Sequence, residues 1–243
     1  KNTYVFFVTY ANLDDWSPST PDEYSNNTIS ELDQWILSEL HNLVKDVTDA
    51  LDNYDATGAT RPIERFVDLL SNWYVRLSRR RFWKTEDDSD KHAAYATLYQ
   101  CLLSVSKILA PSMPFISDAI YRNLTGEEAL APESVHLADW PILSADSNSG
   151  SDILPPIDMM VEAKMEMVRT LAEAGRRIRI EAGRRQRLPC QSGWIVGGPD
   201  ISEFHDILAD ELNVELLETE IDLDRFQRIE LAPNRKALGK KCR

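Results

Sequence analysis

Arginine and aromatic side chains are concentrated in residues 71–84, which read SNWYVRLSRRRFWK. Guanidinium groups bind phosphates through paired hydrogen bonds, and an aromatic ring offers a flat face on which an unpaired base can stack. Each stacking contact of this kind is worth about 1–3 kcal/mol. The stretch therefore has the chemistry that is needed to hold a single-stranded loop of nucleic acid.

The apolar spacing predicts that this stretch belongs to a helix that starts near Pro62. At about 100° per residue, Trp73 and Tyr74 turn toward the core, and Arg81 falls on the same apolar side. The helix ends there, or Arg81 extends its charged end to solvent. The outward side carries what we call the arginine stripe, made of Asn72, Arg76, Arg79 and Trp83, with Arg80 and Lys84 beside it.

A second basic cluster lies in residues 169–187, which contain seven arginines. Such a run most often does no more than keep a helix face soluble. A contact with a phosphate backbone is the alternative. The candidates for that contact are Arg176, Arg177, Arg184 and Arg185.

Sequence patterns for catalysis or metal binding are absent. The four histidines have no metal-ligand spacing, and the three cysteines lie far apart, which argues against a disulfide framework. There is no GxSxG motif and no phosphate-binding loop. The chain is therefore predicted to be a binding module without catalytic residues, metal or cofactor of its own.

The net charge of −13 over 243 residues would, as an average, repel a polyanion. Residues 11–58 hold most of that charge, with eleven acids and a single base, Lys45. Because charges act over roughly 8–10 Å in physiological salt, a local basic surface can still attract nucleic acid. The sequence has no apolar run that could span a bilayer and no signal-peptide cleavage site. We expect a cytoplasmic protein with no membrane partner.

Amphipathic helices must position the arginine stripe. Residues 28–54 repeat apolar side chains every three or four positions, and Thr28 with Glu31 fits a capping box at the start. Further helices are predicted over about 91–109 and 115–124. Four or more such helices with short joints indicate a helical bundle.

The sequence changes character after a small, polar stretch that is typical of a linker. The spacing in the long helix that follows places Met160 and Ile178 on the core side. Short apolar runs after Pro189, with a helix between them, indicate a small α+β unit. The predicted fold is mainly α, with a helical bundle over residues 1–143, a linker over 144–154, and a long helix plus a truncated α+β subdomain over 155–243.

Several motifs, in order along the chain, resemble the anticodon-binding region of isoleucyl-tRNA synthetase, a class I aminoacyl-tRNA synthetase. The most specific of them is LLSNWYVRLSRRRFWK. The N-terminal KNTYVFFVTYANLD is similar to the first helix of that region, and AYATLYQCLLSVSKILAPSMPFISDAIYRNL is similar to its later bundle helices. GRRIRIEAGRRQRLP resembles the helix and turn that open its C-terminal part. The resemblance extends along the whole chain.

The resemblance implies ATP-dependent attachment of isoleucine to its tRNA. In the family, ATP and Mg²⁺ are used by a catalytic part with HIGH- and KMSKS-type signatures, and neither signature occurs in this sequence. The editing domain is missing as well. The chain is therefore expected to be a C-terminal fragment of a larger enzyme. Its expected partners are isoleucine tRNA and the catalytic and editing domains of its parent.

The resemblance also implies roles for individual positions. Asn2 and Phe6 occupy positions from which related synthetases reach the anticodon loop. Trp83 lies near the place where a tryptophan of the methionyl relative stacks on an anticodon base. The motif itself supplies Asn72, Arg76, Arg79 and Arg80, the set that the helical wheel reached independently.

Other interpretations stay open from the residues. In a protein-interaction module, the arginine stripe would pair with an acidic partner or with another domain of the parent. In a structural stripe, the arginines would pair with the acids of residues 11–58 and Trp83 would lie in the core. The valyl and leucyl relatives share the bundle, so an anticodon-binding region of one of these enzymes is a further alternative.

Overall fold

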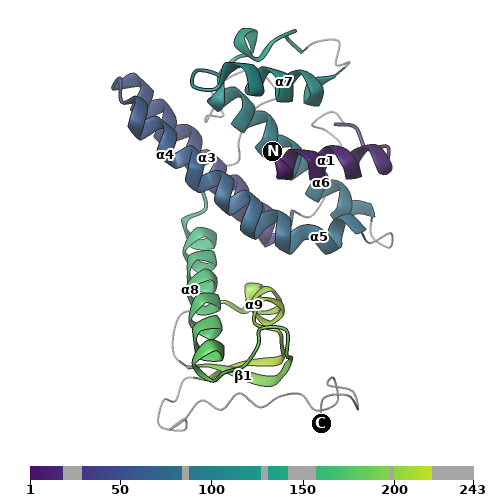
Figure 1. Ribbon diagram of the computed structural model, residues 1–243, viewed down its shortest axis with the longest axis vertical. Helices are drawn as coiled ribbons and strands as arrows, with labels where there is room; N and C mark the ends of the chain where they lie inside the picture. The colour runs from purple at the N-terminus through teal and green to yellow at the C-terminus, as the bar shows by residue number, and fades with distance from the viewer. Residues whose placement is uncertain (19–28, 84–87, 127–130, 142–156, 197–199, 221–243) are drawn as a thin grey trace. The chain divides into compact units, whose positions relative to one another are not determined.

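The structure is a computed structural model that describes residues 1–18, 29–83, 88–126, 131–141, 157–196 and 200–220 (Figure 1). The chain divides into two compact units, Lys1–Met159 and Met160–Arg243. Helices dominate, and a two-stranded parallel sheet lies in the second unit. The predicted mainly α fold with a small α+β part is therefore confirmed. The predicted linker, residues 144–154, lies outside the described residues.

The first unit is a helical bundle. It comprises α1 (Asn2–Leu13), α3 (Glu31–Asp52), α4 (Ala56–Leu69), the π-helical segment η1 (Leu70–Tyr74), α5 (Val75–Trp83), α6 (Asp88–Leu109), α7 (Pro114–Thr125) and the short 3-10 helix η2 (Val135–Leu137). α3 and α4 pack side by side, and α6 packs against α1, α3, α5 and α7 (Figure 1). Trp35, Ile36 and Leu40 of α3 are almost fully buried in the core.

A capping box starts α3, but its residues are not the predicted pair. The Ser30 hydroxyl accepts a hydrogen bond from the Asp33 amide, and the Asp33 carboxylate accepts one from the Ser30 amide. The prediction of Thr28 and Glu31 was therefore wrong. The same three-residue spacing recurs two residues later, at Ser30 and Asp33. The Asp33 carboxylate also forms hydrogen bonds with side chains of other helices. Thr28 itself lies outside the described residues.

α4 begins at Ala56, not near Pro62 as predicted. The Asp55 carboxylate accepts a hydrogen bond of 2.8 Å from the Gly58 amide and so caps the helix earlier. A Cβ at Gly58 would lie 2.3 Å from a carboxylate oxygen of Asp55, so a larger residue would force this capping side chain to shift. Pro62 consequently lies inside the helix, where it removes one backbone hydrogen bond.

Asp33 is a fully buried carboxylate that joins several helices. The Arg81 guanidinium donates to its two oxygens at 2.8 and 2.7 Å, and the Tyr74 hydroxyl donates to it at 2.6 Å. Arg81 Nη2 also lies 2.7 Å from a carboxylate oxygen of Asp90. These contacts connect the start of α3 with η1, α5 and the start of α6.

The charge states in this network follow from its geometry. Burial disfavours the charged form of Arg81, but the hydrogen bonds and charge of Asp33 outweigh it and raise the pKa of the guanidinium. Burial and the adjacent carboxylate raise the pKa of Tyr74 well above its ordinary value, so its hydroxyl remains a neutral donor. The predicted position of Arg81 on the apolar side is confirmed, and Asp33 is the reason that it is tolerated there.

The second unit begins with α8 (Met159–Glu181). The other elements are β1 (Cys190–Val196), the 3-10 helix η3 (Ser202–Phe204), α9 (His205–Leu212) and β2 (Val214–Glu220). β1 pairs with β2 in parallel, with Cys190 opposite Val214. The predicted core side of α8 was wrong at Met160, which is 66 % exposed, whereas Ile178 is half-buried. The buried residues of α8 are Val161, Met165, Val168, Ala172 and Arg179.

Arg179 is a buried cation that holds the second unit together, with 2 % of its surface exposed. It donates hydrogen bonds to the carbonyl oxygens of Leu188, Leu212 and Asn213 at 2.8, 2.5 and 3.0 Å. The last two carbonyls lie at the C-terminal end of α9, where the helix dipole favours a positive charge. One side chain thus links α8, α9 and the segment before β1.

We predict that Asp33→Ala lowers the free energy of unfolding of the first unit by about 3–5 kcal/mol, because it leaves the buried Arg81 without its partner. Urea denaturation followed by tryptophan fluorescence measures this. The control is Arg79→Ala, an exposed site on the same helix as Arg81, with an expected change within about 0.5 kcal/mol. Equal losses of unfolding free energy in the two variants would show that the Asp33–Arg81 pair is not a special source of stability.

We predict that Arg179→Ala lowers the stability of the second unit by about 2–4 kcal/mol, since hydrogen bonds to a charged group contribute about 1.5–3 kcal/mol each and are not additive. Amide hydrogen exchange in β1 and β2 measures the loss. Arg177→Ala is the matched control, because Arg177 is exposed and pairs only at the surface with Glu181. Unchanged protection in the Arg179 variant would show that its carbonyl contacts are unimportant.

Candidate nucleic-acid interface

The arginine stripe lies along η1 and α5, so it does not lie on one regular α-helix. In η1 the Val75 amide donates to the Leu70 carbonyl, five residues back. Such π-helical turns are rare and occur frequently at functional sites. Trp73 and Tyr74, which belong to this turn, are buried as predicted. The turn was not foreseen, because the helical wheel assumed uniform geometry.

All members of the stripe are exposed, and so is Arg80 beside it. Trp83 is 57 % exposed at the end of α5, so much of its indole is available for stacking. The alternative that placed Trp83 in the core is therefore wrong. Arg81, which lies outside the stripe, pairs with Asp33 of the acidic segment. Lys84 lies outside the described residues.

Arg76 is held in a defined direction by two contacts. Its Nε donates to the Asn72 carbonyl at 2.7 Å, and its guanidinium carbon lies 5.2 Å from the centre of the Trp73 ring. The second contact is a cation–π interaction. A side chain that is already ordered loses less conformational entropy when it binds a phosphate.

α1 lies beside η1 and α5, which brings the predicted residues of the first helix next to the stripe. The hydroxyls of Thr3 and Ser71 are hydrogen bonded at 2.9 Å. The Phe6 and Phe82 rings meet edge to face, with their centroids 5.1 Å apart. Asn2 is exposed, whereas Phe6 is half-buried and uses much of its ring for packing.

An aromatic cluster supports α5 from the core side. Tyr95 packs against Phe82 with ring centroids 4.9 Å apart and stacks on Trp16 at 5.5 Å. Its hydroxyl donates to Asp14, which also pairs with Lys91 at 2.6 Å. Partial burial works against the Asp14 carboxylate, but hydrogen bonds from Lys91 and Tyr95 outweigh it and lower its pKa. This cluster is not evident in the sequence, because its members come from three separate segments.

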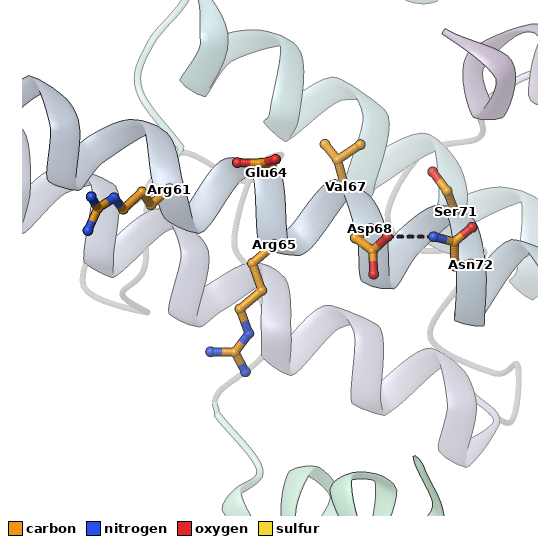
Figure 2. A pocket seen from close by; sticks show the side chains of 7 residues that line it. All are labelled: Arg61, Glu64, Arg65, Val67, Asp68, Ser71 and Asn72. Carbon is orange, nitrogen blue, oxygen red and sulfur yellow. Dashed lines mark hydrogen bonds between the residues drawn. The ribbon is translucent and has the colours of Figure 1, made fainter. Parts of the chain in front are cut away.

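A shallow groove on the exposed side of α4 and η1 extends the surface beyond the stripe (Figure 2). Asn72 belongs to both the groove and the arginine stripe. Within the groove, Asn72 Nδ2 donates to Asp68 Oδ1. The residues that line the groove are Arg61, Glu64, Arg65, Val67, Asp68, Ser71 and Asn72. None of these except Asn72 was a candidate from the sequence.

The second basic cluster lies in the second unit, and several of its arginines have acidic partners. Arg176 donates to Glu211 at 2.6 Å, and Arg177 donates to Glu181 at 3.0 Å. Arg184 and Arg185 are exposed just after the end of α8. The paired arginines fit the predicted solubilising role better than a phosphate contact.

Within the described residues, no group of three or more His, Cys, Asp or Glu side chains is arranged to hold a metal ion. None of the helices in this part of the chain is long and apolar enough to cross a membrane. Cys101 and Cys190 are buried free thiols. Burial raises the pKa of Cys101 well above its ordinary value, which keeps this thiol protonated and unreactive.

Residues 33–192 match a protein-family model described as "Anticodon-binding domain of tRNA ligase". The match covers more than half of the chain and runs from α3 into β1. It therefore includes η1, α5 and the groove on α4.

Similar curated proteins are named isoleucine–tRNA ligases. The relative from Dehalococcoides mccartyi is 43 % identical over 225 residues, which is 90 % of this chain and 21 % of the relative. Those from Clostridium novyi and Chlamydia trachomatis are 38 % and 36 % identical, over 98 % and 99 % of this chain and 22 % of each relative. The chain thus spans about a fifth of the length of the relatives it matches. It belongs to the family of anticodon-binding domains of tRNA ligases.

Proposed function

We propose that this chain is the anticodon-binding part of an isoleucine–tRNA ligase and that it binds the anticodon stem-loop of isoleucine tRNA. The observation that carries the proposal is the exposed arginine stripe on η1 and α5, which lies inside the segment that matches the family. The names of the curated relatives support the choice of isoleucine.

Some residues of the stripe bind phosphates, and others contact bases. Arg76, Arg79 and Arg80 bind phosphates, which fixes the orientation of the loop without reading its sequence. Trp83 stacks on an unpaired base, and Asn72 recognises a base edge. Affinity therefore comes mainly from the arginines, and specificity from Asn72 and Trp83.

The interior of the first unit supports this arrangement by fixing α5. Arg81 and Tyr74 bind the buried Asp33, and Phe82 packs in the aromatic cluster. With these inward-facing side chains held in place, the neighbouring stripe residues must face outward. A platform ordered before binding loses less entropy when the RNA docks.

In the longer protein, anticodon binding helps to select the tRNA and to place its acceptor end at a distant active site. There isoleucine is attached with the use of ATP and Mg²⁺, in the cytoplasm. The residues for that chemistry belong to a part of the enzyme whose signatures this sequence lacks.

The purified chain alone is expected to give no isoleucine-dependent ATP–pyrophosphate exchange, because it carries no HIGH- or KMSKS-type signature. Exchange measured with labelled pyrophosphate tests this. Activity that stays with the chain through successive purification steps would contradict the expectation.

Fluorescence anisotropy with an isoleucine anticodon stem-loop tests the proposal directly. We expect a preference over a loop changed only at its anticodon bases, and a log–log salt slope of about −0.7 per neutralised phosphate. Replacing Arg76, Arg79 and Arg80 together by glutamine should weaken binding by about tenfold or more and reduce the magnitude of the slope by about 2. Arg122→Gln, an exposed change on α7, is the charge control.

The other outcomes of this experiment separate the alternatives. Unchanged RNA affinity in the triple variant would favour a protein-interaction surface. Unchanged affinity with a lower melting temperature would favour a structural stripe. A preference for a valine or leucine stem-loop would assign the chain to one of those relatives.

A further inference from the structure

We infer that Asp68 is a positioning residue for Asn72, and that together they form a pair of acceptors that selects a loop base with an exocyclic amino group. This inference rests on the proposed function and deepens it. The pair lies one helical turn apart, with Asp68 at the end of α4 and Asn72 in the middle of η1.

The hydrogen bond between the two side chains sets the direction of the Asn72 amide. An ionised carboxylate only accepts hydrogen bonds, so the amide nitrogen must be the atom that faces Asp68. The amide oxygen is then turned away from Asp68 (Figure 2). Asn72 consequently presents its Oδ1 as an acceptor, and Asp68 adds the carboxylate oxygen that Asn72 does not use.

An acceptor pair distinguishes bases by their exocyclic groups. Adenine, guanine and cytosine each carry an amino group that can donate, whereas uracil presents carbonyl oxygens in the corresponding positions. A carbonyl placed against a carboxylate is disfavoured, because neither group can donate. The pair should therefore favour an amino-bearing base and reject a base that lacks the amino group.

The charge of the groove favours a base over a phosphate at this point. Its arginines, Arg61 and Arg65, are balanced by its acids, Glu64 and Asp68, so the groove is formally neutral. A neutral groove has little attraction for an anion, and polar acceptors in it suit a base edge. The phosphate-binding charge lies in the adjacent stripe.

Arg76 connects the phosphate-binding stripe with the base-binding pair Asp68 and Asn72. Its Nε is bonded to the main-chain carbonyl of Asn72, so the guanidinium and the amide belong to one small region. A nucleotide whose phosphate is bound by Arg76 therefore has its base within reach of Asn72. Both side chains are exposed on the same surface.

The test uses anticodon stem-loops in which one base at a time is replaced by an analogue without its amino group: purine for adenine, inosine for guanine or uracil for cytosine. For the unaltered chain, we expect about a 5- to 150-fold loss of affinity at one position. Asp68→Asn keeps the shape but lets the Asn72 amide turn. This substitution should reduce that loss to a few-fold while leaving the effects at the other positions unchanged.

Glu64→Gln is the matched control, since it removes the same charge from the same groove without touching the Asn72 hydrogen bond. A role of the Asp68–Asn72 pair in helix stability alone would not change the base preference. Urea unfolding checks that both variants are folded.

The outcomes separate this inference from the proposed function. If the unaltered chain prefers the cognate loop but Asp68→Asn keeps the full base preference, the inference is overturned and the proposed function stands. The inference is also overturned, with the proposed function intact, if no position depends on an amino group, or if Glu64→Gln has the same effect as Asp68→Asn. If the unaltered chain shows no preference for the cognate loop, the proposed function fails, and the inference fails with it.

Discussion

The buried carboxylate of Asp33 is the contact on which the first unit depends. It accepts hydrogen bonds from Ser30, Tyr74 and Arg81, which come from the start of α3, from η1 and from α5. A buried charge without these partners would cost several kcal/mol, so arrangements that displace η1 or α5 are strongly disfavoured. The outward direction of the arginine stripe is a consequence of this inward anchor.

Arginine has two opposite roles in this protein. Arg81 and Arg179 are buried and organise the first and second units through carboxylate and carbonyl oxygens. Arg76, Arg79 and Arg80 are exposed and provide the surface proposed to bind RNA. Residue type alone does not separate these roles, because the same guanidinium serves in both. What separates them is the side of the helix and the polar atoms that lie opposite.

The periodicity of the sequence predicted most of the helices of the bundle and the exposed stripe, although some boundaries and faces were wrong. The start of α4 was missed because Asp55 caps the helix ahead of Pro62. The packed face of α8 was missed because the large side chain of Met160 is exposed, whereas Arg179 is buried. At α4 a local polar contact moved the boundary, and at α8 a buried arginine held by carbonyl oxygens departs from the average preference of its residue type.

Composition and spacing by themselves determined that this chain forms amphipathic helices and that arginines and aromatics are concentrated in one stretch of helix, because these properties are local. Only the tertiary structure decided that Arg81 pairs with Asp33, 48 residues earlier, and that α1 lies beside η1. It also revealed the π-helical turn and the groove that contains Asp68. The Arg81–Asp33 pair and the contact of α1 with η1 depend on which segments meet in space, and a carboxylate distant in sequence becomes a partner only when packing places it there.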